Sequence, residues 1–316
     1  MKSGPTTSSP SAALSWRAIG RSWPHHTHSR FVNAGGVRWH VQEMGSEDHE
    51  MPVLFLLHGA GASTHSWRDL MPGLAKHFRV IAVDLPGHAF SDSPAVYRPT
   101  LQRVSALLGE LIQILGIDVR LAVGHSAGAA TLARMALDHR ITPAGVVSFN
   151  GAFQPFDGAA GTIFPALAKL LFVNPLTPRL FALSGRSRSR VVRLIEGTGS
   201  RLTDEGLNYY RVLMQSPGHI AGVLGMMAHW ELSQLMRELP SLNVPLLLIA
   251  GDKDRAVPPK VSKDVADHCE HAKLELWPGL GHLAHEEAPE RAVERIVSFA
   301  QTLGVLQTPA KADIQN

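Results

Sequence analysis

The sequence predicts an α/β protein in which helices flank a mostly parallel central sheet and a helical segment is inserted into the core. Short apolar runs of strand length alternate with segments of helical periodicity along most of the 316 residues. Such alternation is typical of a parallel sheet that is covered on both faces. Between about residues 153 and 240 the alternation stops, and only helical patterns occur, separated by prolines.

The chain is long enough to bury one large core, so we expect a single α/β unit with a cap and two tails. The N-terminus is polar and rich in Pro and Ser, which predicts a flexible arm. The predicted parts are the arm at 1–27, the core at 28–152 and 241–304, the helical cap or lid at 153–240, and a C-terminal tail at 305–316.

The first half of the core opens with a predicted hairpin, because Asn33-Ala34-Gly35-Gly36 separates two strand-like segments. Apolar runs too short for helices then predict buried strands. Apolar side chains recur with helical spacing at 101–115, and a second helix is predicted at 127–138. The predicted strands lie at 30–32, 37–42, 53–57, 79–83, 121–123 and 146–149.

The same pattern resumes after the inserted segment. An apolar strand is predicted at 246–250, followed by a helix that begins after Pro259. A further strand is predicted at 274–277 and a last helix at 290–303.

Composition and charge exclude several classes of protein. Thirty lysines and arginines against 27 acidic residues give a net charge of +3. No sequence motif for nucleic-acid recognition accompanies this small positive charge, so nucleic acid is not an expected partner. The single cysteine, Cys269, rules out an internal disulfide and fits a reducing compartment. With no signal peptide and no run of about eighteen apolar residues, we expect a cytoplasmic protein.

No cofactor or metal is expected. The chain has neither a Gly-x-Gly-x-x-Gly dinucleotide turn nor a phosphate loop. The run His25-His26-Thr27-His28 contains metal-binding side chains, but no Cys or carboxylate stands close by in the sequence. We interpret this run as part of a solvated tail.

The sharpest chemical motif is Gly124-His125-Ser126-Ala127-Gly128, which follows an apolar strand and opens a helix. In this context the motif predicts a nucleophile elbow, a tight turn that lifts the serine hydroxyl above the carboxyl edge of the sheet. Side chains at positions 124 and 128 would clash in such a turn, and glycine relieves the clash. Ser126 is therefore the predicted nucleophile.

A serine hydroxyl needs a base, and the base needs a third group that orients it. His282 follows the strand at 274–277 and is the predicted base. Asp252 and Asp254 both follow the strand at 246–250, and we favour Asp254 as the acid because Val257-Pro258-Pro259 then begins the next helix at a suitable distance. A structural role in the turn is the alternative for either aspartate.

The backbone amides of Ala60 and Ala127 are the predicted oxyanion hole. Ala60 follows His58-Gly59 at the end of the strand at 53–57, and Ala127 follows the nucleophile. Small residues here let the backbone approach the developing negative charge, and one such donor is worth about 3 kcal/mol of barrier. For His58 we expect a hydrogen bond that sets the loop.

Together these segments resemble α/β-hydrolase-fold enzymes over residues 28–304. The resemblance rests on His58-Gly59, Asp84-Leu85-Pro86-Gly87-His88 with Ser91-Asp92, the elbow at Ser126, the turn at Asp254 and Gly281-His282. It departs at Ala89, where glycine is common. A serine at 126 argues against the haloalkane dehalogenase and epoxide hydrolase relatives, whose nucleophile is a carboxylate.

A narrower set of segments resembles the magnesium-chelatase accessory subgroup of bacteriochlorophyll biosynthesis. These are Gly36-Val37-Arg38-Trp39-His40-Val41-Gln42, residues 61–70, Gly124-His125-Ser126-Ala127-Gly128-Ala129-Ala130, Thr198-Gly199-Ser200-Arg201-Leu202 and Gly225-Met226-Met227-Ala228. The resemblance implies a role near magnesium insertion into protoporphyrin IX. It also implies magnesium-chelatase subunits as partners.

The cap combines apolar side chains with arginines. Residues 162–173 and 217–230 are strongly apolar, and Arg186, Arg188, Arg190 and Arg193 lie between them. Apolar groups over a catalytic serine suit a bulky apolar ligand. Substrate contacts are expected from His58, His125, Trp67, Met227 and Trp230. The arginines form a solvated face, or they meet porphyrin propionates, an anionic membrane or an acidic protein.

Two functional hypotheses follow. The first is a serine hydrolase that cleaves an ester of a bulky apolar substrate through an acyl-enzyme. The second is a non-catalytic protein that binds a tetrapyrrole or assists the chelatase. Peripheral membrane contact through the cap is compatible with both.

Overall fold

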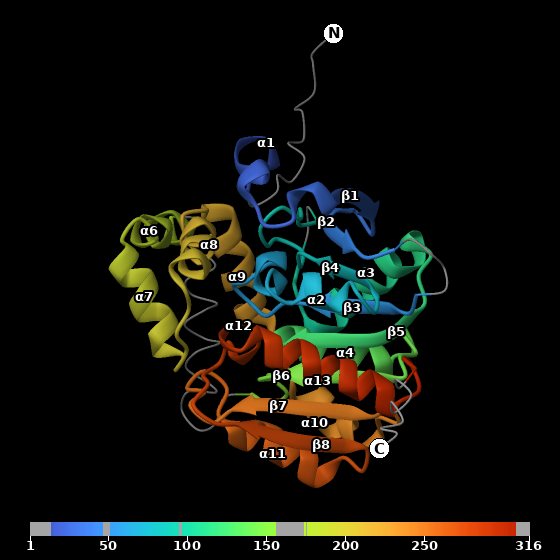
Figure 1. Cartoon of the computed structure of the whole chain (residues 1–316). Helices are drawn as coiled ribbons and strands as arrows, with labels where there is room; N and C mark the ends of the chain where they lie inside the picture. Colours follow the sequence, from blue (N-terminus) through green and yellow to red (C-terminus); the bar gives the residue numbers. More distant parts are fainter. Residues whose placement is uncertain (1–13, 47–50, 95–96, 156–173, 175, 308–316) are drawn as a thin grey trace, which may run out of the picture.

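The computed structural model describes residues 14–46, 51–94, 97–155, 174 and 176–307 (Figure 1). The predicted C-terminal tail beyond residue 307, the first part of the predicted arm and the apolar stretch 162–173 therefore lie outside the described residues.

One sheet of eight strands forms the centre of the molecule, in the order β1-β2-β4-β3-β5-β6-β7-β8. The strands from β4 through β3 to β8 pair in parallel, and β1 and β2 form the predicted hairpin, antiparallel to each other and to β4. This confirms the predicted α/β class. The strands are β1 (Ser29–Ala34), β2 (Val37–Met44), β3 (Val53–Leu57), β4 (Arg79–Val83), β5 (Val119–His125), β6 (Gly145–Phe149), β7 (Leu246–Gly251) and β8 (Ala272–Trp277).

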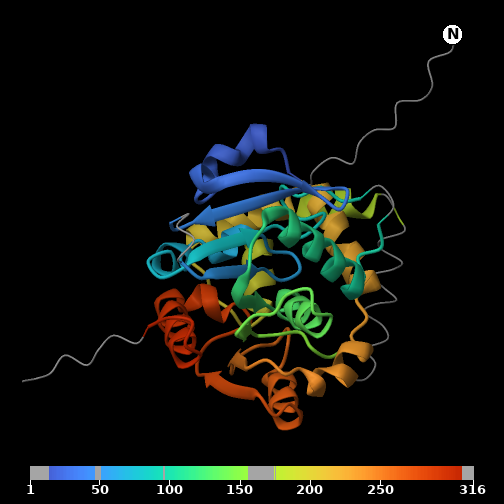
Figure 2. The ribbon, with the colours of Figure 1, turned by 90° about the vertical axis from the view of Figure 1, so that its right-hand side faces the viewer.

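Helices cover both faces of the sheet (Figure 2). One core cluster lies under α3 (Leu101–Leu115) and α4 (Ala127–Leu137), and the other lies under α2 (Met71–Leu74) and α13 (Pro289–Thr302). The boundaries of α3 match the prediction because both ends carry local stop signals: Thr100 caps the first turn and Gly116 ends the helix at φ 61°. The remaining core helices are η3 (Thr64–Trp67), α11 (Pro259–His268) and α12 (Ala284–Glu287).

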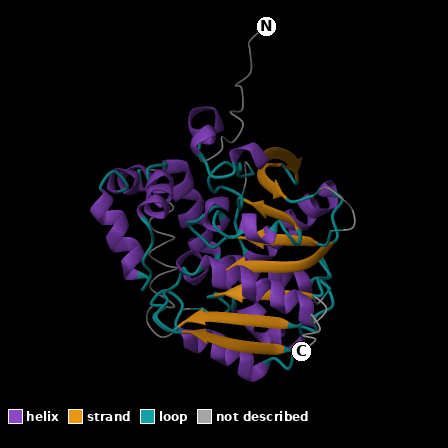
Figure 3. Cartoon of the chain, viewed as in Figure 1, coloured by secondary structure: helices purple, strands orange, loops and turns teal. Residues whose placement is uncertain are grey.

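Between β6 and β7 the described residues form helices and no strand, as predicted for the cap. They lie beyond the carboxyl ends of the strands, toward which the arrowheads point (Figure 3). The helices are α6 (Thr177–Ser184), α7 (Arg188–Gly197), α8 (Asp204–Met214), α9 (Pro217–His229), α10 (Ser233–Glu238) and η4 (Leu239–Ser241).

Residues 14–28 do not form the flexible arm that the sequence analysis predicted. They make three short helical segments, α1 (Trp16–Ile19), η1 (Gly20–Ser22) and η2 (His26–His28). Trp23 is only 3% exposed and packs edge-on against Phe90 and Tyr209. Tryptophan brings a large apolar surface, and its burial outweighs the polar character of the surrounding sequence.

Candidate active site

Ser126 stands at the junction of β5 and α4, where the motif predicted a nucleophile elbow. Its backbone adopts φ 50° and ψ −117°, a strained conformation for a residue that carries a side chain. Hydrogen bonds hold this turn in place, because Ser126 N–H donates to Phe149 O and Ala152 N–H donates to Ser126 O. The side-chain Oγ makes no hydrogen bond to another described residue.

The two glycines of the motif are required by close backbone contacts. A Cβ at Gly124 would lie 2.5 Å from Ala129 N, and a Cβ at Gly128 would lie 2.2 Å from Leu57 O. Both distances are far below van der Waals contact. The structure therefore bears out the steric reason for glycine on either side of the serine.

The structure selects Asp254 over Asp252 as the partner of His282. Asp254 Oδ2 accepts a hydrogen bond of 2.8 Å from His282 Nδ1, whereas exposed Asp252 caps the amide of Gly279. Because Nδ1–H donates to the carboxylate, Nε2 remains as the acceptor of the neutral ring. This is the tautomer that a general base requires.

Asn150 belongs to the site and was missed by the sequence analysis. It follows β6, is 1% exposed, and its Nδ2 donates to Asp254 Oδ2 at 2.7 Å. The other carboxylate oxygen accepts the amides of Ala256 and Val257, each at 2.8 Å. Four donors thus hold the acid rigidly. The only local signal was an asparagine at the carboxyl end of a buried strand, where α/β sheets place ligands.

His125 brings the elbow and the base into one place. Its ring lies 4.7 Å from that of His282, and its Nε2–H donates to His282 O at 2.9 Å. His285 packs against the other side, 4.6 Å from the His125 ring. Burial lowers the pKa of His125 well below its usual range and that of His285 to about 3. These two histidines are therefore neutral supports behind the site.

The loop after β3 lies directly against Ser126. A Cβ at Gly59 would come within 2.9 Å of Ser126 Cβ. Only glycine at this position therefore lets the backbone amide of the next residue, Ala60, lie close to Ser126. Ala60 is exposed, and Ala127 is the first residue of α4, whose first-turn amides have no acceptor within the helix. Two amides are thus available near the serine.

The fully buried His58 sets this loop, as the sequence analysis expected. Its Nδ1–H donates to Gly59 O at 2.8 Å, and its Nε2 accepts Leu85 N–H at 2.9 Å. Burial lowers the pKa of the ring, which keeps the neutral tautomer that both bonds require.

Three of the five predicted substrate contacts are buried within the protein, and for them contact with a substrate stays a prediction. His58 and Trp67 are 0% exposed and His125 is 3% exposed. Trp67 packs in the core beneath α13 and against His285. Met227 of α9 is 38% exposed, and Trp230 at the end of α9 is half-buried against the core. For these two, substrate contact stays a prediction.

The cap holds the loops that carry Asp254 and His282. Thr198 O accepts the amide of Arg255, and Ser200 Oγ accepts the amide of Leu283. Between these two residues lies Gly199, at φ 89°. Its backbone is so close to that of Lys253 that a Cβ would lie 1.9 Å from Lys253 O. The segment 198–200, noted above only as part of a resemblance, therefore braces both loops.

The family follows from the match of a family model, described as the alpha/beta hydrolase fold, to residues 52–289. The chain belongs to the α/β hydrolase fold family. The magnesium-chelatase 30 kDa subunit of Rhodobacter capsulatus is 42% identical over 274 residues, which cover 87% of this chain and 95% of that protein. The resemblance to this subgroup is thereby confirmed.

Other members of the α/β hydrolase fold family are more distant. Haloalkane dehalogenase 2 of Mycobacterium tuberculosis is 28% identical and matches 85% of this chain and 93% of its own. The crystal structure of a protein from Acinetobacter baumannii, named "putative lipase (lip1)", superposes with a TM-score of 0.75 at 16% identity, over 92% of this chain and 97% of the other. The structural likeness concerns the fold alone.

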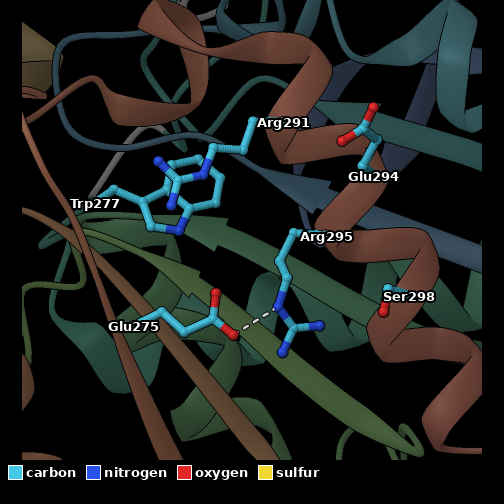
Figure 4. A pocket seen from close by; sticks show the side chains of 6 residues that line it. All are labelled: Glu275, Trp277, Arg291, Glu294, Arg295 and Ser298. Atoms are coloured by element: carbon cyan, nitrogen blue, oxygen red, sulfur yellow. Dashed lines mark hydrogen bonds and ion pairs between the residues drawn. The ribbon is translucent and has the colours of Figure 1, made fainter.

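A surface pocket of about 380 Å³ lies elsewhere on this hydrolase fold, between β8 and α13 (Figure 4). Arg295 pairs with Glu275 there, and the Arg291 guanidinium stacks 4.1 Å from the Trp277 ring. Neither Ser126 nor His282 lines it. The pocket therefore does not extend the candidate site.

The described ranges of the chain contain neither a metal-type cluster of side chains nor a membrane-spanning helix. No cluster of three or more His, Cys, Asp or Glu side chains there has the arrangement of a metal site. None of the helices in the described ranges has the length and apolarity needed to cross a bilayer.

Proposed function

We propose that this protein is a serine hydrolase in which Ser126, His282 and Asp254 act as nucleophile, base and acid. The observation that carries the proposal is the Asp254–His282 hydrogen bond, which leaves His282 Nε2 as acceptor beside a strained serine elbow. A structural elbow would need neither a buried carboxylate with four donors nor a histidine oriented by it.

The proposed reaction begins when Ser126 Oγ attacks the carbonyl carbon of an ester while its proton passes to His282 Nε2. The amides of Ala60 and Ala127 stabilise the oxyanion of the tetrahedral intermediate. The carbon–oxygen bond to the alcohol then breaks, and His282 returns its proton to that alcohol. Water attacks the acyl-enzyme by the same route and releases the acid. Asp254 stays ionised and stabilises the imidazolium.

We propose a bulky apolar ester as the substrate, of the tetrapyrrole type. The cap presents Met227 beyond the carboxyl edge of the sheet, and the relative named as a magnesium-chelatase subunit connects the family to that chemistry. Chelatase subunits are the corresponding proposed partners. The cytoplasm is the proposed location, since the single cysteine, Cys269, fits a reducing compartment.

A fluorophosphonate probe tests the nucleophile. The Ser126 Oγ–phosphorus bond forms, fluoride leaves, and intact mass spectrometry records one added phosphonyl group. We expect one adduct on the wild type, none on Ser126→Ala, and slow labelling of His282→Gln. An adduct on Ser126→Ala, or no adduct on a wild type shown to be folded by circular dichroism, would contradict the proposal.

The second candidate is a non-catalytic protein that binds a tetrapyrrole or assists the chelatase, favoured by the name of the 42% identical relative. Titration of the wild type and Ser126→Ala with protoporphyrin IX separates the two functions. Equal porphyrin affinity together with an unreactive Ser126 would favour binding. Labelling of Ser126 and turnover of a porphyrin ester would favour catalysis.

A further inference from the structure

The outer face of α6 and α7 exposes large apolar side chains of a kind that folded proteins usually bury in the core. Five of the nine large hydrophobic side chains exposed in the described residues come from positions 176–194. They are Leu176, Leu180, Phe181, Leu183 and Leu194, exposed by 45–63%. Leu176, Leu180 and Leu183 follow each other at i, i+4 and i+7, which aligns them on one side of α6. We call this surface the α6–α7 face.

Arginines alternate with these leucines on α6, on α7 and in the turn between them. Residues 176–197 contain five arginines and a single acidic residue, Glu196, which gives a local charge of +4. Arg188 pairs with Asp204. Arg179, Arg186, Arg190 and Arg193 are exposed and form no ion pair with the described part of the chain. The local excess exceeds the +3 of the whole molecule, so the positive charge is concentrated on this face.

We propose that the α6–α7 face is a docking surface for an anionic lipid bilayer. Interleaved leucine and arginine side chains on amphipathic helices are suited to the interface, where arginines pair with phosphate groups and leucines enter the acyl region. A protein partner instead favours an apolar centre with a polar rim. The mixture of the two kinds of side chain on one face therefore favours lipid.

The α6–α7 face belongs to the cap, whose segment 198–200 contacts the candidate active site. The segment 198–200 directly follows α7 and hydrogen-bonds the loop that carries Asp254. A docked bilayer would thus lie on the cap, on the side of the sheet where the strands end and Ser126 stands (Figure 1). Apolar ligands dissolved in the bilayer would then reach the site without crossing bulk water.

Co-sedimentation of the full chain with vesicles tests this docking surface. We expect binding to phosphatidylcholine vesicles in which about one lipid in three is phosphatidylglycerol. Binding should be weaker in high salt, and vesicles of phosphatidylcholine alone should bind little protein. Arg186→Gln/Arg190→Gln should weaken partitioning about 25-fold, at about fivefold for each arginine. Leu180→Ser/Leu183→Ser should weaken it at least tenfold.

Matched controls come from the same chain. Ile114 and Leu276 are exposed by 63% and 54%, against 63% and 53% for Leu180 and Leu183, but they lie on α3 and β8. Ile114→Ser/Leu276→Ser should bind vesicles like the wild type, as should Ser126→Ala, since docking does not depend on catalysis. Each variant is first shown to be folded by its thermal melt.

Three results would overturn the proposal. The first is a folded wild type that ignores anionic vesicles. The second is equal loss of binding in the control pair and in the face variants. The third is a dimer, detected by light scattering, that the face variants dissociate while vesicles have no effect, because that result would assign the face to a second copy.

Discussion

His219 joins the cap to two loops of the core, and its burial predicts a specific dependence of stability on pH. The ring is 2% exposed on α9, its Nε2–H donates to Gly61 O, and its Nδ1 accepts Ala89 N–H, each at 3.2 Å. Nδ1 can accept the Ala89 amide only while the ring is neutral, because both nitrogens of a protonated histidine are donors. Burial is the main cause that lowers the pKa of His219 to about 4.

A histidine pKa that is lower in the folded than in the unfolded protein makes the fold less stable as pH falls. The unfolded ring takes up a proton near its ordinary pKa of 6.5, whereas folded His219 takes one up only near pH 4. Between those values the unfolded state binds more protons, so the free energy of unfolding decreases with decreasing pH. From pH 7 to pH 5 the two pKa values give a loss of about 2 kcal/mol from this residue.

Urea denaturation of the wild type and of His219→Gln at pH 7 and pH 5 measures this contribution. Glutamine can donate to Gly61 O and accept from Ala89 N–H, but it does not titrate. The wild type should lose about 2 kcal/mol more than His219→Gln between the two pH values. Other buried histidines contribute equally to both proteins and cancel in the difference.

Exposed His77 provides the control, because His77→Gln should leave the pH dependence unchanged. If His219→Gln loses as much stability as the wild type between pH 7 and pH 5, His219 is not the source of the pH dependence. The same conclusion follows if His77→Gln reduces the loss of stability by as much as His219→Gln does.

Three further substitutions probe the contacts around the site. Asn150→Ala removes a charge-assisted hydrogen bond from the Asp254 carboxylate, and it should lower the free energy of unfolding by about 2 kcal/mol and slow fluorophosphonate labelling. Gly199→Ala should destabilise the fold by more than 2 kcal/mol and slow labelling, while Gly197→Ala, which has no atom within 4 Å of its Cβ, should do neither. Arg68→Met leaves the buried carboxylate of Glu286 without its ion-pair partner and should lower the free energy of unfolding, measured by chemical denaturation, by about 3–5 kcal/mol. Arg68→Met/Glu286→Gln should recover at least half of that loss.

The core strands could be predicted because their signal is local. A strand buried on both faces is apolar at every position, as in residues 53–57 and 246–250. The strand predicted at 121–123 extends to Val119–His125, since Arg120 and Gly124 interrupt the apolar run without interrupting the pairing. Tertiary pairing decided those ends.

The position of Trp23 could not be predicted, because its burial depends on residues far away in the chain. Its neighbours in the sequence are polar or break helices, which is typical of a tail. The partners that bury it, Phe90 and Tyr209, come from the loop after β4 and from the cap. No local pattern records such contacts.

The residues of the candidate site also differ in whether a local sequence signal reveals them. Ser126 and His282 could be predicted because each stands in a short motif after a strand. Asp254 could be ranked above Asp252 only by spacing, and the hydrogen bond to His282 provides the physical reason. Asn150 was missed because its partner lies 104 residues away. The hydrogen bonds through which His58 and His125 support neighbouring loops join residues that are distant in the sequence, so sequence alone could not reveal these partners.

The cap contacts argue that this segment is part of the site's framework and more than a cover. His219 ties α9 to the loops after β3 and β4, and a Cβ at Gly222 would lie 2.1 Å from Gly87 O, so α9 and the core are in direct backbone contact. Ser200 holds the loop of His282 in the same manner. Lifting these parts would break hydrogen bonds that hold the loops of His282 and Asp254.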